Sequence, residues 1–221
     1  QLARQLIDKD QVIANHGPQW SAEGEAVFPI CERSKILCFS PTSTKPGVSA
    51  PYMWAFRNTV DENVLVPQTL KWVKDNYPWV KTAAILTDIK DAYSKSLGYD
   101  TFRPKLKEFG IEVVEEVDYV TGDTDFSAHI TKIKAKNPDM IAIGGTWVES
   151  ANMMKEAEKQ GLKVLWVGGV GFGNARIIEN TGCKPYLIQK TCISLVNRMH
   201  DERRRRITIA DVDAVGRMAE A

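Results

Sequence analysis

Short apolar runs alternate with longer amphipathic stretches along most of this chain. The apolar runs cover residues 12–17, 35–40, 81–88, 111–120, 140–145 and 163–169. Stretches with apolar positions every three or four residues cover 63–77, 94–109, 126–136 and 148–160. Strands that alternate with helices of about 10–15 residues predict βαβ units and a parallel sheet. Runs such as AAIL and MIAI are apolar on both faces, which is typical of parallel strands covered by helices on either side.

The alternation is interrupted once and then stops, and these two points divide the chain. Three prolines, a glycine and several hydroxyl residues break the pattern over 41–60. We therefore expect a crossover between lobes near Arg57–Asn63, with 1–60 forming a partial first lobe, because so few residues cannot bury a parallel sheet of their own. Residues 61–182 are predicted to form a second lobe. Residues 183–221 lose the alternation, which indicates a divergent or frame-shifted tail.

The first residues of the chain lack an initiator methionine and a signal-peptide pattern. Leu2, Leu6 and Ile7 fall on one helical face, so the sequence is interpreted as starting within a helix that leads into a strand. We expect it to be a fragment or a processed piece of a longer protein.

Composition excludes several classes of protein. Of the 221 residues, 43% are hydrophobic and 26% are charged, which is ordinary for a globular protein and excludes wholesale disorder. The sequence has no run of about 20 apolar residues, so no transmembrane helix is predicted. Lys and Arg number 29 against 28 Asp and Glu, a net charge of +1. This balance gives no electrostatic reason to expect a nucleic-acid partner.

Catalytic, metal and cofactor motifs are weak in this sequence. It has no GxSxG elbow and no GxxxxGK[ST] phosphate loop, and GGVGFGN does not match GxGxxG. The four cysteines form no CxxC pair, and Cys31 and Cys38 are interpreted as buried thiols. His129 falls on an apolar helical stripe and is interpreted as a packed side chain, whereas His16 at a strand end is a candidate ligand contact. We expect no enzyme activity, no cofactor and no metal.

The loops after the predicted strands carry the candidate binding chemistry, because ligands of open parallel sheets bind beyond the carboxyl ends of the strands. Ser21 is expected to cap a helix whose free N–H groups bind anions. The hydroxyl row at 40–44 can hold a carboxylate, or it can be turn chemistry alone. The tryptophans are either ligand-stacking faces or packed side chains. The candidates are Trp20, Ser21, Thr42, Ser43, Thr44, Tyr93, Thr146, Trp147 and Val170. Together they suit a small organic acid with an apolar or aromatic body.

Four stretches carry a family resemblance. They are VIANHGPQWSAEGEAVFPICERSKILCFSPTST, YMWAFRNTVDEN, DFSAHITKIKAKNPDMIAIGG and ESANMMKEAEKQGLK. In this order, over about residues 1–182, they resemble type I periplasmic solute-binding proteins of ABC importers, in the leucine/isoleucine/valine-binding branch. The resemblance implies two Rossmann-like parallel-sheet lobes, the first incomplete here, joined by three crossovers and closing on a ligand like a hinge. It also implies a periplasmic location and an ABC permease as partner.

The resemblance also implies roles for several of the candidate residues. The helix start around Pro18–Ser21, with Thr42 and Thr44, would hold the carboxylate and ammonium of an amino acid, and Tyr93 and Thr146 would complete the site from the second lobe. Branched-chain amino acid binders place an acidic residue where this sequence has Val170. Because a buried ammonium without a counter-charge is costly, this departure favours a carboxylate ligand that lacks an ammonium.

Two other functions stay open from the sequence. The same fold serves as the ligand-sensing domain of receptors or regulators, and a transmembrane helix or output domain beyond this chain would indicate that role. An amidase or hydrolase on an α/β sheet would need a nucleophile, for which Ser21 and Ser43 are the candidates to test by loss of turnover.

Overall fold

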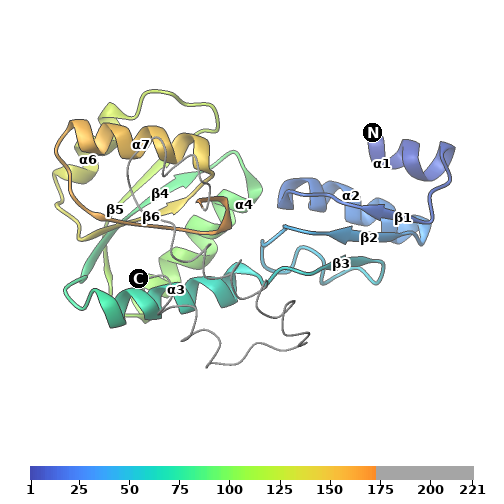
Figure 1. Cartoon of the computed structure of the whole chain (residues 1–221), viewed down its shortest axis with the longest axis horizontal. Helices are drawn as coiled ribbons and strands as arrows, with labels where there is room; N and C mark the ends of the chain where they lie inside the picture. The colour runs from blue at the N-terminus through green and yellow to red at the C-terminus, as the bar shows by residue number, and fades with distance from the viewer. Residues whose placement is uncertain (173–221) are drawn as a thin grey trace, which may run out of the picture.

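Two parallel sheets organise the computed structural model, which describes residues 1–172 (Figure 1). The first sheet has the strand order β1-β2-β3, with β1 at Ala14–His16, β2 at Leu37–Ser40 and β3 at Ala55–Arg57. The second has the order β5-β4-β6-β7, with β4 at Thr82–Asp88, β5 at Glu112–Tyr119, β6 at Met140–Gly144 and β7 at Leu165–Gly168. All neighbouring strands pair in parallel. The predicted parallel α/β class is confirmed, and the expected tail at 183–221 lies outside the described residues.

The first lobe packs one helix, α2 (Ser21–Ser34), on one face of its sheet. Its core consists of Phe28, Cys31, Cys38, Val48 and Ala55. A short N-terminal helical segment, α1 (Leu2–Arg4) continuing into the π-helical η1 (Gln5–Lys9), precedes β1. Ile7 of this segment packs against the same core.

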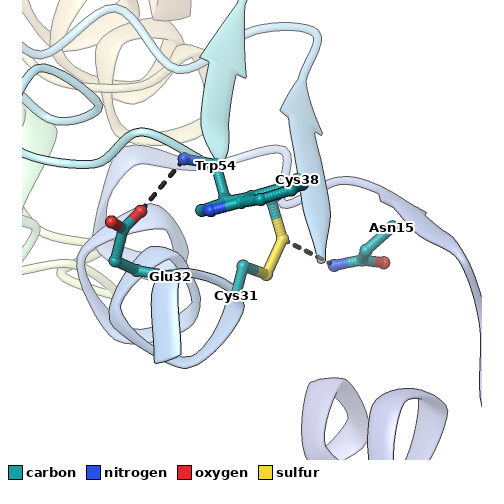
Figure 2. The surroundings of a disulfide bond; sticks show 5 residues. All are labelled: Asn15, Cys31, Glu32, Cys38 and Trp54. Atoms are coloured by element: carbon teal, nitrogen blue, oxygen red, sulfur yellow. Dashed lines mark hydrogen bonds between the residues drawn. A yellow bond between two sulfur atoms is a disulfide. The ribbon is translucent and has the colours of Figure 1, made fainter. Parts of the chain in front are cut away.

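Cys31 and Cys38 form a disulfide, so their interpretation as buried thiols is wrong (Figure 2). The helix α2 ends in a left-handed residue, Lys35, and the chain turns directly into β2. This return places the two Cα atoms 6.1 Å apart, within the range that a disulfide bridges. Asn15 donates to the sulfur of Cys38 from the neighbouring strand, as Figure 2 shows. The bond thus joins α2 to β2 inside the first-lobe core.

The opposite face of the first sheet is open in the described residues. The pairing register places His16 and Phe56 on either side of Phe39, so the three rings share one row. His16 stacks on Phe39, with ring centroids 5.8 Å apart. Phe56 is 49% exposed and Leu37 is 39% exposed. Parallel sheets are normally covered on both faces, so this face is unusual for its architecture.

The second lobe has helices on both faces of its sheet. One face is covered by α3 (Glu62–Asn76) and by the helical run α4 (Ala92–Lys95), η2 (Ser96–Phe102) and α5 (Arg103–Glu108). The other face is covered by α6 (Ser127–Lys134) and α7 (Trp147–Lys159). The central strand β6 is buried along its whole length, as its apolar sequence predicted. His129 on α6 packs against Phe126, which confirms its interpretation as a packed side chain.

The helical run predicted over 94–109 contains the π-helical segment η2, which lies very close to the sheet. A Cβ atom added at Gly98 would lie 2.2 Å from Oγ1 of Thr87 in β4, and one added at Gly144 in β6 would lie 2.5 Å from the carbonyl of Ser94. Only glycine permits this approach. The approach fixes α4, and with it Tyr93, over the carboxyl ends of β4 and β6.

Within residues 1–172, no helix is both long and apolar enough to cross a membrane. The same residues contain no group of three or more potential metal ligands.

Candidate functional site

The candidate site lies where the carboxyl ends of the two sheets approach each other. The helix α2 that follows β1 lies in contact with α4, which follows β4, so the two lobes meet at these helices (Figure 1). The chain passes between the lobes after β3 and enters α3 at Glu62. Side chains from both lobes therefore lie near this crossover.

The hydroxyl row at 40–44, which follows β2, forms hydrogen bonds with the loop after β1. Thr42 donates its hydroxyl to the carbonyl of Gln19 at 2.6 Å, and the Ser43 hydroxyl reaches the same carbonyl at 3.4 Å. Ser40 donates to the Ser43 hydroxyl at 2.7 Å. These side chains therefore hold the loop after β1 against the loop after β2, and their part in ligand binding stays a prediction.

The residue at the N-cap of α2 is not the one that the sequence predicted. Ser21 is the first helical residue and Trp20 occupies the N-cap position, so the prediction that Ser21 caps the helix is wrong. Glu23 accepts hydrogen bonds from the main chain of Gln19 and Trp20 and takes over part of the capping. The Ser21 hydroxyl instead accepts from the N–H of Lys45, at 3.2 Å. The helix start is therefore tied to the hydroxyl row, and the Trp20 side chain is 42% exposed beside it.

Tyr93 stands on the second-lobe side of the crossover. It is only 3% exposed, and its hydroxyl accepts a hydrogen bond from the N–H of Gly171 at 3.1 Å. Burial, with the nearby negative charge of Glu62, raises the pKa of this phenol well above its usual range. A Cβ atom at Gly169 would lie 2.5 Å from the Tyr93 hydroxyl, so the loop after β7 passes directly against this hydroxyl.

Thr146, Trp147 and Val170 occupy the same end of the second sheet. Thr146 is the N-cap of α7 and donates its hydroxyl to Glu149 at 3.0 Å. Trp147 is half-buried and packs against the second-lobe core, as the packing alternative predicted. Val170 is half-exposed in the short helix η3 (Val170–Phe172). The next residue, Gly171, lies against Thr146 and the Tyr93 ring, so these second-lobe candidates come together.

Glu62 is the residue that the sequence analysis missed. It is fully buried at the start of α3, and its Oε1 accepts the Thr44 hydroxyl at 2.9 Å. The Tyr93 hydroxyl and the N–H of Val170 also face the carboxyl, short of full hydrogen-bond geometry, and Oε2 has no hydrogen-bond partner in the described residues. Burial raises the pKa of Glu62, although the polar groups around it lower the pKa in part. No sequence signal marked it, because an acidic residue in the first helical turn is ordinary.

The structure therefore brings four residues to one point. Thr44 comes from the first lobe, Glu62 from the crossover, and Tyr93 and Val170 from the second lobe. Ser21, Thr42 and Ser43 lie next to this point on the first-lobe side, through the hydrogen bonds given above. The arrangement offers hydroxyls, a helix start and one carboxylate to a small ligand, and it contains no nucleophile–base pair among its described hydrogen bonds.

The sequence matches a known family over most of its length. Residues 1–185 match the family described as periplasmic binding protein. The Leu/Ile/Val-binding protein homolog 3 of Brucella melitensis is 29% identical over 153 residues, which are 67% of this chain and 40% of the relative. The chain spans half or less of the length of the curated relatives it matches.

Solved structures share the fold. The leucine-binding protein LivK of Thermotoga maritima aligns with a TM-score of 0.76 and 24% identity, over 97% of this chain and 63% of that one. A solute-binding protein of an ABC transporter from Rhodopseudomonas palustris, in complex with 3,4-dihydroxybenzoic acid, aligns with a TM-score of 0.67 and 20% identity, over 77% of this chain and 47% of that one. With the match over 1–185, these similarities show that the chain belongs to the periplasmic binding protein family, with the type I fold of the leucine/isoleucine/valine-binding proteins.

Proposed function

We propose that this chain is part of the solute-binding component of an ABC importer, with an amino acid or related small organic acid held between the two lobes. The observation that carries the proposal is the cluster of Thr44, Glu62, Tyr93 and Val170, which joins groups from both lobes at the crossover. A ligand at this point contacts both lobes at once. Two relatives support the ligand class, since one is named for leucine, isoleucine and valine and the other holds a dihydroxybenzoate.

In the proposed function, the free energy of ligand binding favours the closed arrangement of the lobes, and no covalent bond is made or broken. A ligand that contacts both lobes binds the closed arrangement more tightly than an open one, and only such a difference in affinity shifts the equilibrium between them. The closed form is then the one that a membrane permease recognises. The Cys31–Cys38 disulfide supports a periplasmic location, because structural disulfides persist in oxidising compartments.

Isothermal titration calorimetry on the 221-residue chain tests the proposal, with L-leucine, L-isoleucine and 4-hydroxybenzoate as ligands. We expect saturable binding of at least one of them with one site per chain. The variant Thr44→Val should weaken binding, because it removes a hydroxyl from the cluster. Thr69→Val is the matched control, since the Thr69 hydroxyl bonds only to the carbonyl of Leu65 within α3. No binding of any of the three at millimolar concentration would overturn the proposal.

A further inference from the structure

An exposed aromatic cluster lies at the end of α3, away from the candidate site. Trp72 is 39% exposed on the outer face of α3, and Trp79 is 55% exposed in the turn before β4. The ring of Tyr77 lies between them, with its centroid 5.6 Å from that of Trp72 and 5.9 Å from that of Trp79. We propose that this aromatic cluster and the outer face of α3 form the interface of a symmetric dimer of two copies of this chain.

The aromatic cluster is held in position within a single copy. Tyr77 packs against the second-lobe core and meets both indole rings at steep angles, 68° for Trp72 and 80° for Trp79. Asn76 donates its side-chain amide to the carbonyl of Trp72 at 2.9 Å. Side chains that are already fixed lose little conformational entropy on binding. Tryptophan and tyrosine are also enriched among the residues that dominate the affinity of protein interfaces, so the cluster is suited to a protein partner.

The charges on the outer face of α3 are complementary to those of a second copy. Lys71 and Asp75 form an ion pair one helical turn apart, and both side chains are largely exposed. Trp72 lies between them along the helix. When two identical helices pack antiparallel across a two-fold axis near this point, the lysine of each copy faces the aspartate of the other. The two ion pairs then form between the copies, with the two Trp72 rings near the axis.

The same charges do not favour an anionic membrane as the partner. Residues 71–81 contain three lysines and one aspartate. Lys71 is paired with Asp75, and the carboxylate of Asp139 accepts the main-chain N–H of Lys81 at 2.8 Å. The positive charge that remains is small, whereas segments that bind anionic lipids typically carry about four to eight lysines or arginines. The whole chain has a net charge of +1, so two copies repel each other only weakly.

The proposed interface leaves the candidate ligand site free. The helix α3 begins at Glu62, beside that site, and ends at Asn76, which is about 20 Å away along the helix axis. The following turn leads into β4 at Thr82, so the aromatic cluster lies at the amino-terminal edge of the second sheet. Figure 1 shows this end of α3 on the side of the second lobe that faces away from the first. Dimer formation and ligand binding can therefore be measured separately.

Analytical ultracentrifugation of the 221-residue chain over a range of concentrations tests the proposal. We expect a reversible equilibrium between monomer and dimer in the micromolar range, because an interface built on one helix face is small. Trp72→Ala should raise the dimer dissociation constant by about tenfold or more. Met53→Ala is the matched control, because Met53 is an exposed apolar side chain of the first lobe and its loss should leave the dimer unchanged.

Charge reversal on α3 gives a signature that is specific to a symmetric interface. Lys71→Glu and Asp75→Lys should each weaken the homodimer, because like charges then meet across the two-fold axis. A mixture of the two variants should form a heterodimer, because this face carries two negative charges in one variant and two positive charges in the other. The double variant Lys71→Glu/Asp75→Lys should regain the homodimer.

Other results would overturn the proposal. A chain that stays monomeric up to millimolar concentration has no such interface. A dimer that Trp72→Ala and both charge reversals leave unchanged uses another surface, and one that Phe56→Lys abolishes uses the open face of the first sheet. A monomer that sediments with phosphatidylglycerol vesicles, and no longer does so as Trp72→Ala, would assign the aromatic cluster to a membrane surface.

Discussion

Replacing Gly98 by alanine tests the close approach of η2 to the second sheet. The added Cβ atom would lie 2.2 Å from Oγ1 and 2.8 Å from Cγ2 of Thr87, whereas ordinary contacts begin near 3.4 Å. Overpacking of this kind costs about 1–3 kcal/mol, and an overlap with two atoms of a rigid β-branched side chain belongs at the upper end. Alanine's better helix propensity returns about 1 kcal/mol. We therefore expect Gly98→Ala to lower the free energy of unfolding by about 2 kcal/mol.

Urea unfolding followed by circular dichroism measures this change, and a double-mutant cycle with Thr87→Ala identifies its cause. Removing the Thr87 hydroxyl and methyl leaves the Cβ atom of residue 87 as the nearest contact, at 3.0 Å. The double variant should therefore recover at least half of the loss caused by Gly98→Ala. Additive effects of the two substitutions, or a Gly98→Ala chain as stable as the unsubstituted one, would refute the reasoning.

Three further predictions follow from other parts of the structure. Reduction of the Cys31–Cys38 disulfide removes a constraint on the unfolded chain and so raises its conformational entropy. It should therefore destabilise the first lobe by about 2–3 kcal/mol, measured by urea unfolding with and without dithiothreitol. Because burial raises the pKa of Glu62 in the folded chain, its stabilising contribution is complete below pH 4.5 and is lost as the pH rises through the raised pKa. Glu62→Gln should therefore unfold with a weaker pH dependence over that range, and an unchanged dependence would contradict the assignment. On the open face of the first sheet, Phe56→Lys should reduce aggregation in light scattering while changing the unfolding free energy by less than about 0.5 kcal/mol. Leu37→Lys should behave in the same way, and a large loss of stability in either variant would show that this face is covered.

The regular elements of the second lobe were predictable from the sequence because burial dictates their pattern. The strands β4 and β6 are buried on both faces, and their runs AAIL and MIAI are apolar throughout. The helices α3 and α7 begin and end within about a residue of their predicted bounds. Gly110 and Gly161, expected at helix C-termini, adopt the left-handed conformation with φ of 69° and 70°.

The contacts that build the site were not predictable, because they depend on groups far apart in the sequence. The pairing of Glu62 with Thr44 requires the loop after β2 to lie against the start of α3, and no local pattern indicates that. The Cys31–Cys38 bond depends on the tight turn at Lys35. The π-helical segment η2 arises from the fit of Gly98 against the sheet, which a helical periodicity does not reveal.

Hydrogen exchange with and without saturating L-leucine tests most directly that a ligand is held between the two lobes. The account predicts slower exchange in both lobes at once, at the start of α2 and the hydroxyl row in the first lobe, and at α4 and the loop after β7 in the second. Protection confined to one lobe, or no protection under conditions where calorimetry detects binding, would contradict it.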